Sequence, residues 1–158
     1  MELRPARPDE AKLLSALALR SKAHWGYNDS FLAACKHELA IRREEMASRH
    51  VTVAVVDGVV AGHYTIDGTD LGQLFVDPAH IGRGVGRALW RHAVATAREL
   101  GIEMLSIDSD PFAEGFYLAM GATRVGSVPS GSIPGRELPR LTYSTSGGRR
   151  GRRVACTP

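Results

Sequence analysis

The chain has 158 residues, of which 44% are hydrophobic, and this length and composition predict one globular domain with a single core. No apolar run approaches the ~18–20 residues of a membrane span, and the charged N-terminus lacks the apolar segment of a signal peptide, so we expect a cytoplasmic protein. The net charge of +3 depends on Arg149, Arg150, Arg152 and Arg153, without which the chain carries a net charge of −1. A nearly neutral body argues against nucleic-acid binding.

The C-terminal residues are rich in Gly, Ser and Arg, a composition typical of disorder. We therefore divide the chain into a folded domain over residues 1–144 and a basic, disordered tail over residues 145–158. A solubilising tail is favoured over one that contacts nucleic acid. Cys35 and Cys156 lie far apart and no Cys/His cluster has metal-ligand spacing, so we expect neither a disulfide nor a metal site.

Two helices are predicted near the N-terminus, after a short first strand. Pro8-Asp9-Glu10 is typical of a helix start, and apolar residues continue at helical spacing to Ala18. This helix is expected to end before His24. The Asn28-Asp29 pair can cap the second helix, whose predicted apolar positions are Phe31, Leu32, Cys35, Leu39 and Met46.

Three antiparallel strands are predicted next, over residues 51–56, 59–66 and 71–76. They are rich in β-branched residues, and Asp57-Gly58 and Asp67-Gly68 are typical hairpin turns between them.

A glycine-rich segment follows the third of these strands, and an amphipathic helix follows the glycines. Gly82, Gly84 and Gly86 alternate with Arg83, Val85 and Arg87. Glycines at a helix start let several unpaired backbone N–H groups point into one space, where the helix dipole adds positive charge. The segment therefore predicts a cradle for a phosphate or pyrophosphate, with the two arginines as additional cations.

The remaining elements are a strand over residues 102–107, a helix from Asp110 to about Met120, and strands over residues 122–128 and 138–143. The helix that follows the glycines places Leu89, Ala93, Ala97 and Leu100 on one face and ends at Gly101. The order of elements predicts an α/β fold with a mixed sheet.

Two other interpretations of the glycine segment are open. A dinucleotide site requires G-x-G-x-x-G at the end of a strand, whereas this chain has G-x-G-x-G starting six residues after Val76. Asp108, at the end of the next strand, nevertheless lies where a ribose-binding acid could sit. The second alternative is a tight turn that binds nothing.

The segment LFVDPAHIGRGVGRALW resembles the coenzyme A-binding motif of the GNAT acetyltransferase superfamily, and DPFAEGFYLAMGA resembles the helix that follows in that family. The resemblance extends from about Leu3 to Tyr143. It implies a GNAT-like, mostly antiparallel central sheet of about seven strands flanked by about four helices. It also implies acetyl-CoA as the cofactor and is compatible with a homodimer.

The resemblance assigns roles to particular residues. Backbone groups of Leu74, Phe75 and Val76 would bind the pantetheine arm and the acetyl carbonyl, and the N–H groups from Gly82 to Arg87 would bind the pyrophosphate. Three positions depart from the family pattern. Ile81 replaces an Arg or Gln, Asp110 replaces an Asn that contacts the cofactor, and Phe112 fills a position that is often polar.

Acetyl transfer to an amine needs an acid for the leaving thiolate and a base for the incoming ammonium. Tyr117 is the candidate acid, although Phe116 and Tyr117 could simply pack the helix. The base is less evident. Asp70 is our candidate, with His63 as an alternative, because both lie with Gln73 on strands that should border the acceptor cleft.

Trp25 and Tyr27 are the candidate substrate-binding residues, because paired aromatics between the first two helices could line a pocket or equally plug the helix junction. Arg136, in the loop over residues 130–140, could contact an acidic acceptor or simply be solvated, and we favour the solvated side chain. We expect an N-acetyltransferase that acts directly on a small-molecule amine. The alternatives are a protein N-terminal or lysine acetyltransferase and a non-catalytic acyl-CoA-binding sensor.

Overall fold

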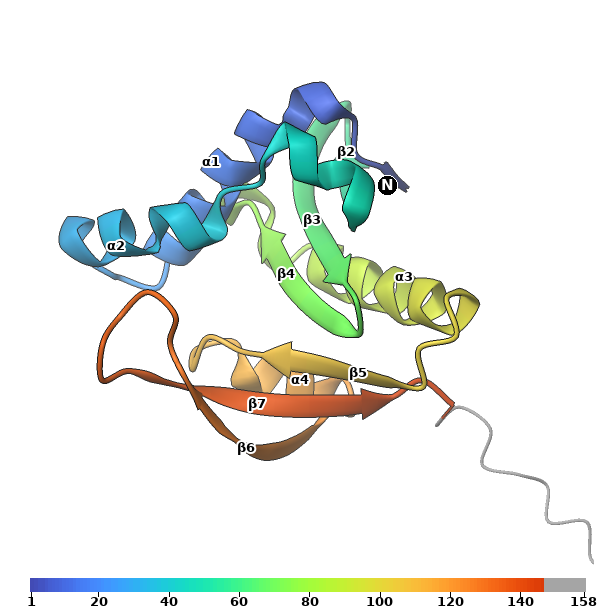
Figure 1. Cartoon of the computed structure of the whole chain (residues 1–158). Helices are drawn as coiled ribbons and strands as arrows, with labels where there is room; N and C mark the ends of the chain where they lie inside the picture. Colours follow the sequence, from blue (N-terminus) through green and yellow to red (C-terminus); the bar gives the residue numbers. More distant parts are fainter. Residues whose placement is uncertain (147–158) are drawn as a thin grey trace, which may run out of the picture.

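Seven strands form one sheet in the order β1-β2-β3-β4-β5-β7-β6 in the computed structural model, which describes residues 1–146 (Figure 1). Neighbouring strands pair antiparallel except β4 and β5, which pair parallel. The strands are β1 (Glu2–Pro5), β2 (His50–Val56), β3 (Val59–Asp67), β4 (Asp70–Val76), β5 (Met104–Asp108), β6 (Thr123–Pro129) and β7 (Glu137–Ser144).

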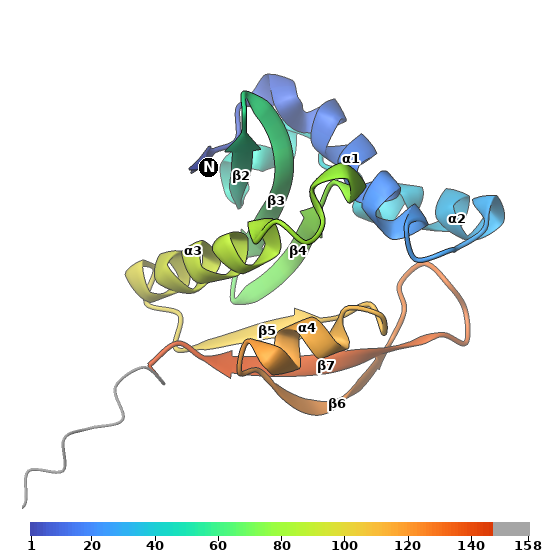
Figure 2. The same cartoon turned by 180° about the vertical axis from the view of Figure 1, so that it is seen from behind.

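Helices cover both faces of the sheet. Figure 2, the view from behind, shows α3 and α4 in front of the sheet, with α1 and α2 on its other side. The α-helices are α1 (Ala11–Ala23), α2 (Asp29–Leu39), α3 (Val85–Glu99) and α4 (Glu114–Ala119). The short 3-10 helices are η1 (Pro8–Glu10), η2 (Arg43–Ser48) and η3 (Pro78–His80).

The sheet splits between its two parallel strands. β4 pairs with β5 only at Asp70 with Ser106 and at Leu71 with Ile107, and the strands then diverge (Figure 1). A bulge lies at the same point, because Gln73 and Leu71 pair with consecutive residues of β3 and leave Gly72 unpaired. A Cβ at Gly72 would lie 2.9 Å from the Thr65 hydroxyl, so a side chain there would displace its neighbour.

The amphipathic face of α3 packs on β3 and β4 in the main core. Its buried positions include Leu89, Ala93 and Ala97, as the helical spacing predicts. Close approach of α3 depends on Gly62 of β3, because an added Cβ would lie 2.7 Å from the Phe75 carbonyl oxygen and 2.9 Å from Leu89 Cδ1. Gly62 thereby sets the position of the glycine segment relative to the end of β4.

The predicted fold class and element order are confirmed, and the differences are local. The second helix ends at Leu39, and Met46 lies in η2 instead; of the five predicted apolar positions only Cys35 and Met46 are buried. The predicted helix from Asp110 shortens to the six residues of α4, because the Asp110 carboxylate accepts from the Phe112 N–H in the preceding turn. Leu100 is 44% exposed, since it lies at the end of α3 where the helix leaves the sheet.

The predicted tail falls almost entirely outside the described residues, as does Cys156. Thr145 is buried, and its hydroxyl donates to the Ile102 carbonyl oxygen at 2.6 Å. Within residues 1–146, no helix combines the length and apolar character needed to cross a bilayer, and no three acidic, His or Cys side chains are grouped to hold a metal ion.

Candidate active site

Two cavities lie where β4 and β5 diverge. The larger, about 350 Å³, is bounded by the end of α1, the end of β4, the glycine segment and the start of α4. The smaller, about 130 Å³, is bounded by α2, β4, the end of β5 and the β6–β7 loop. The two cavities share six lining residues and therefore meet there: Lys22, Leu74, Phe75, Asp110, Ala113 and Tyr117.

The glycine segment lines the large cavity with unpaired backbone donors. Gly82 and Gly84 both have φ of +80°, a conformation that other residues adopt only with strain, and Gly84 is the N-cap residue of α3. The N–H groups of Val85, Gly86 and Arg87 in the first turn have no acceptor among residues 1–146. With the helix dipole, they give this part of the cavity wall a partial positive charge.

The two arginines predicted to strengthen this surface differ in position. Arg87 lines the large cavity, whereas Arg83 is exposed and lies outside its wall. The cationic contribution at this wall therefore comes from Arg87.

The end of β4 presents free backbone groups to the opening. Leu74, Phe75 and Val76 pair with β3 on one side, but β5 has already diverged on the other. The Asp77 N–H donates to the Ala61 carbonyl oxygen, so Phe75, two residues earlier, also faces β3, and the backbone groups of Leu74 and Val76 face away from it. All three line the large cavity.

Tyr117 lies at the boundary between the cavities. Its ring is buried on α4 and packs edge-on against Trp90 and Phe116, with centroids 5.8 and 5.3 Å away. Burial, together with the negative charge of Asp110, raises the pKa of the Tyr117 hydroxyl, which therefore stays protonated at neutral pH. The residue thus combines a protonated hydroxyl with access to both cavities.

A buried polar cluster surrounds Asp110 at the same boundary. Its carboxylate accepts from Lys22 Nζ at 3.0 Å, from the Tyr27 hydroxyl at 3.0 Å and from Arg136 Nη2 at 3.2 Å. Burial acts to raise the pKa of Asp110, but hydrogen bonds from the Phe112 N–H and from Lys22 outweigh it, so the pKa lies below its usual range. The carboxylate is therefore charged and fully engaged.

This cluster corrects the prediction for Arg136. Its side chain is only 17% exposed rather than solvated, and Arg136 Nη2 donates to the Tyr27 hydroxyl at 2.7 Å. Lys22 was not predicted at all, although a signal was present. The buried stripe of α1 passes through Leu14 and Ala18, and a further step of four residues reaches Lys22.

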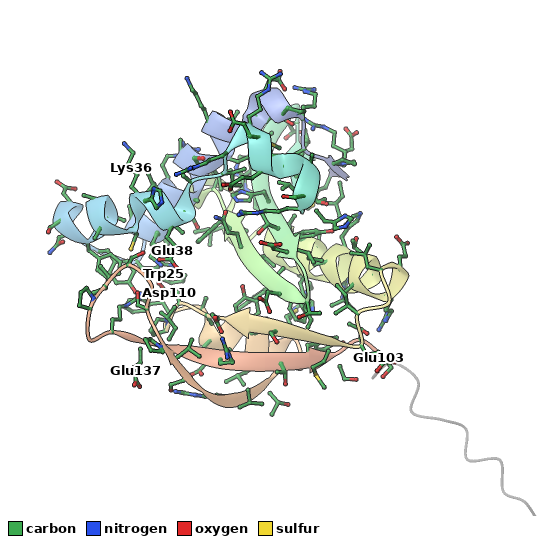
Figure 3. The ribbon with its side chains drawn as sticks, in the orientation of Figure 1. Trp25, Lys36, Glu38, Glu103, Asp110 and Glu137 are labelled. Carbon is green, nitrogen blue, oxygen red and sulfur yellow. The ribbon has the colours of Figure 1, made fainter. Side chains whose placement is uncertain are left out.

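The two aromatic candidates for substrate binding occupy different places. Trp25 stacks on Phe112, with ring centroids 5.5 Å apart, and lines the large cavity. Tyr27 stacks on Phe31 at 3.9 Å and lines neither cavity, although its hydroxyl bonds to Asp110 and Arg136. Figure 3 shows Trp25 and Asp110 close to the end of α2, far from Glu103 at the other end of β5.

The structure does not bring the two candidate bases to the cavities. Asp70 is exposed at the start of β4, opposite Ser106, and lines neither cavity. His63 is completely buried in β3, and burial lowers its pKa to about 4. Its Nε2 lies 2.9 Å from Gln73 Oε1, and Gln73 is the one of these three residues that lines the small cavity.

Comparison with known proteins agrees with this geometry. A family model described as an acetyltransferase (GNAT) domain matches residues 14–130. The fold is similar to that of a GCN5-related N-acetyltransferase from Rhodopseudomonas palustris, with a TM-score of 0.78 and 23% identity over 90% of this chain and 94% of that one.

Two further similar structures were solved with a cofactor. PaiA N-acetyltransferase from Thermoplasma acidophilum, in complex with coenzyme A, has a TM-score of 0.74 and 16% identity over 90% of this chain and 98% of its own. YncA from Salmonella typhimurium, with acetyl-CoA, has a TM-score of 0.65 and 20% identity over 99% of both chains.

Proposed function

The chain belongs to the GNAT acetyltransferase family, and we propose that it transfers the acetyl group of acetyl-CoA directly to the amine of a small molecule. The observation that carries this proposal is the junction of the two cavities. A large cavity with an anion-binding wall meets a smaller polar cavity beside the hydroxyl-bearing ring of Tyr117. Two reactants could enter from opposite sides and meet there, which makes direct transfer possible without a covalent enzyme intermediate.

The residues of the large cavity fit coenzyme A. The N–H groups at the start of α3, together with Arg87, would hold the diphosphate. The mainly apolar wall suits the pantetheine arm, and the free backbone groups of Leu74 and Val76 would hydrogen-bond its amides. The volume of about 350 Å³ lies in the usual range of small-molecule sites.

Bound acetyl-CoA supplies the acetyl group as an activated thioester. The chain would orient it along β4, and a free N–H of that strand would stabilise negative charge on the acetyl oxygen. Tyr117 would donate its hydroxyl proton to the leaving sulfur, a role supported by its protonated state and its place at the junction.

Lys22 supports the other half of the reaction. Its ammonium lines both cavities at their junction. A positive charge there disfavours a second one, so it would lower the pKa of an incoming amine and favour the nucleophilic, neutral form. Asp110 is a poor base for this amine, because its carboxylate already accepts four hydrogen bonds and its pKa is lowered.

The proposal is tested by measuring thiol release from acetyl-CoA by the purified full chain with a panel of small amines and short peptides. We expect release with small amines, together with an acetylated product identified by mass. Release with peptides alone would assign the enzyme to protein acetylation. Calorimetric binding of coenzyme A without release from any acceptor would favour a sensor.

A further inference from the structure

We propose that the small cavity binds a carboxylate, so that the acceptors of this acetyltransferase are amines that also carry an acid group, such as α-amino acids. The inference rests on the proposed function, and it goes further because it names the chemical class of the acceptor. It is carried by hydrogen-bond donors of Lys22, Arg136 and Gln73, which converge on the small cavity without partners for all their N–H groups.

The two cations of the small cavity have spare donors. An ammonium carries three N–H groups and a guanidinium five. Among residues 1–146, Lys22 Nζ donates only to Asp110, and Arg136 uses only Nη2, which leaves its Nε and Nη1 without acceptors. The two side chains are 10% and 17% exposed, so water satisfies these groups poorly.

Gln73 adds a third donor, because its amide orientation is fixed. The carbonyl oxygen of Leu39 can only accept, so the group 3.1 Å from it must be the Gln73 NH₂. Gln73 Oε1 therefore accepts from His63 Nε2 on the other side. The second N–H of this NH₂ remains available where Gln73 lines the small cavity.

The carboxylates of the small cavity are already engaged. Glu38 accepts from the Ser132 hydroxyl, and Asp108 pairs with both donor nitrogens of Arg140, at 2.8 and 3.2 Å. Within residues 1–146, both Lys22 and Arg136 form their ion pair with Asp110 alone. The cavity therefore has more hydrogen-bond donors than acceptors free to pair with them, and a carboxylate of the ligand would accept from the spare donors.

The guanidinium of Arg136 is held in a fixed position for this role. Its Cζ lies 4.9 Å from the centroid of the Phe31 ring and 5.3 Å from that of Tyr27, so these rings restrain it. Because Nη2 already donates to Tyr27 and Asp110, a ligand carboxylate would accept a charge-assisted hydrogen bond from the Nε or the Nη1 of this restrained guanidinium, at little entropic cost.

The position of the small cavity relative to the large one would also direct the amine of the acceptor toward the junction of the cavities. Arg136 and Gln73 line only the small cavity, whereas Leu74, Phe75 and Tyr117 line both. A carboxylate bound by the first pair would direct an amine on the adjacent carbon toward the second group. The volume of about 130 Å³ suits an acceptor of amino-acid size better than a peptide.

The test uses matched acceptors with the full chain. Each set contains an α-amino acid, its α-amide and the amine that lacks the carboxyl group, built on glycine, alanine, serine and methionine. We expect higher kcat/KM for the acid than for the amide in at least one set. In Arg136→Gln this preference should fall at least about tenfold, the effect of losing one charge-assisted hydrogen bond. The acetyl-CoA KM should stay the same.

Arg91→Gln is the matched control, because Arg91 is exposed on α3, makes no ion pair among the described residues and lies outside both cavities. The amino groups of an amino acid and of its amide differ in basicity. This difference cancels when the acid-to-amide ratio of kcat/KM is compared between the wild type and a variant. Equal or better use of the amides by the wild type, or an equal loss for acid and amide in Arg136→Gln, would overturn the proposal.

A second variant and a binding measurement keep the test decisive. If Arg136→Gln does not fold, the wild-type comparison and Arg136→Lys, which keeps the charge but loses the planar guanidinium donors, decide the question. If coenzyme A binds but no amine is acetylated, the proposed function fails, and calorimetry with the same amino acids and amides tests the cavity alone. Binding heat from the amino acids but not from the amides, present in the wild type and lost in Arg136→Gln, supports a carboxylate site. The absence of binding heat from the amino acids excludes it.

Discussion

Lys22 and Asp110 form an ion pair across the split in the sheet, with Nζ and Oδ2 3.0 Å apart and both side chains 10% exposed. Lys22 belongs to α1, which packs near β4, and Asp110 lies between β5 and α4 on the other side of the split. The pair therefore connects the two halves of the fold at the place where the cavities meet.

Asp110→Asn is expected to lower the free energy of unfolding by about 3 kcal/mol, because it leaves two poorly hydrated cations without a counter-charge. Urea unfolding monitored by fluorescence measures the change. The matched control is Asp108→Asn, whose partner Arg140 is 47% exposed, and which should cost no more than about 1 kcal/mol. Similar losses in both variants would mean that the buried pair contributes nothing beyond a surface one.

Tyr117→Phe is expected to lower kcat about 100-fold or more while the acetyl-CoA KM changes little, because it removes the proton donor and keeps the ring. The measurement is thiol release at saturating acetyl-CoA with the best amine. Tyr143→Phe is the control, since Tyr143 packs edge-on against Trp90 but lines neither cavity. Unchanged turnover in Tyr117→Phe would leave this tyrosine with a packing role only.

Gly84→Ala is expected to weaken coenzyme A binding about tenfold, because alanine at φ +80° costs about 1–2 kcal/mol and shifts the first turn of α3. Calorimetric titration with coenzyme A gives the affinity directly. Gly115→Ala provides the comparison, since Gly115 lies in α4 and an added Cβ would meet no atom within 4 Å. It should bind coenzyme A normally, with equal or higher stability. Equal affinity in both variants would argue against the glycine segment as the diphosphate site.

The elements could be predicted because their signals are local. The Asp57-Gly58 turn has φ values of +50° and +77°, as a tight hairpin requires, and the apolar spacing of α3 corresponds to its buried face. The resemblance to the GNAT motif depends on similarly local residues. Met46 shows the limit, since apolar spacing alone did not reveal that the helix ends at Leu39 and a new turn begins.

The site residues required tertiary information. Tyr27, Asp110 and Arg136 come from three separate segments, and no spacing along the chain reveals that they bond to each other. For Asp70 the strand was predicted correctly, but the position of the cavities along it depends on where β4 and β5 diverge. That point is set by the bulge at Gly72, which the sequence pattern did not indicate.

His63 predicts a specific pH dependence of stability. Burial lowers its pKa to about 4 in the folded chain from 6.5, so between these values the unfolded chain binds a proton that the folded chain does not. The free energy of unfolding should therefore fall by about 3 kcal/mol as pH drops from about 6.5 to about 4, and this contribution is fully present above about 6.5. Urea unfolding at a series of pH values measures how the free energy of unfolding changes with pH.

His63→Asn should be less stable at neutral pH, because it disturbs the hydrogen bond to Gln73, but it should lose most of this pH dependence. His50→Asn, at an exposed position, should keep it. A slope that survives in His63→Asn would show that other groups cause the loss of stability in acid.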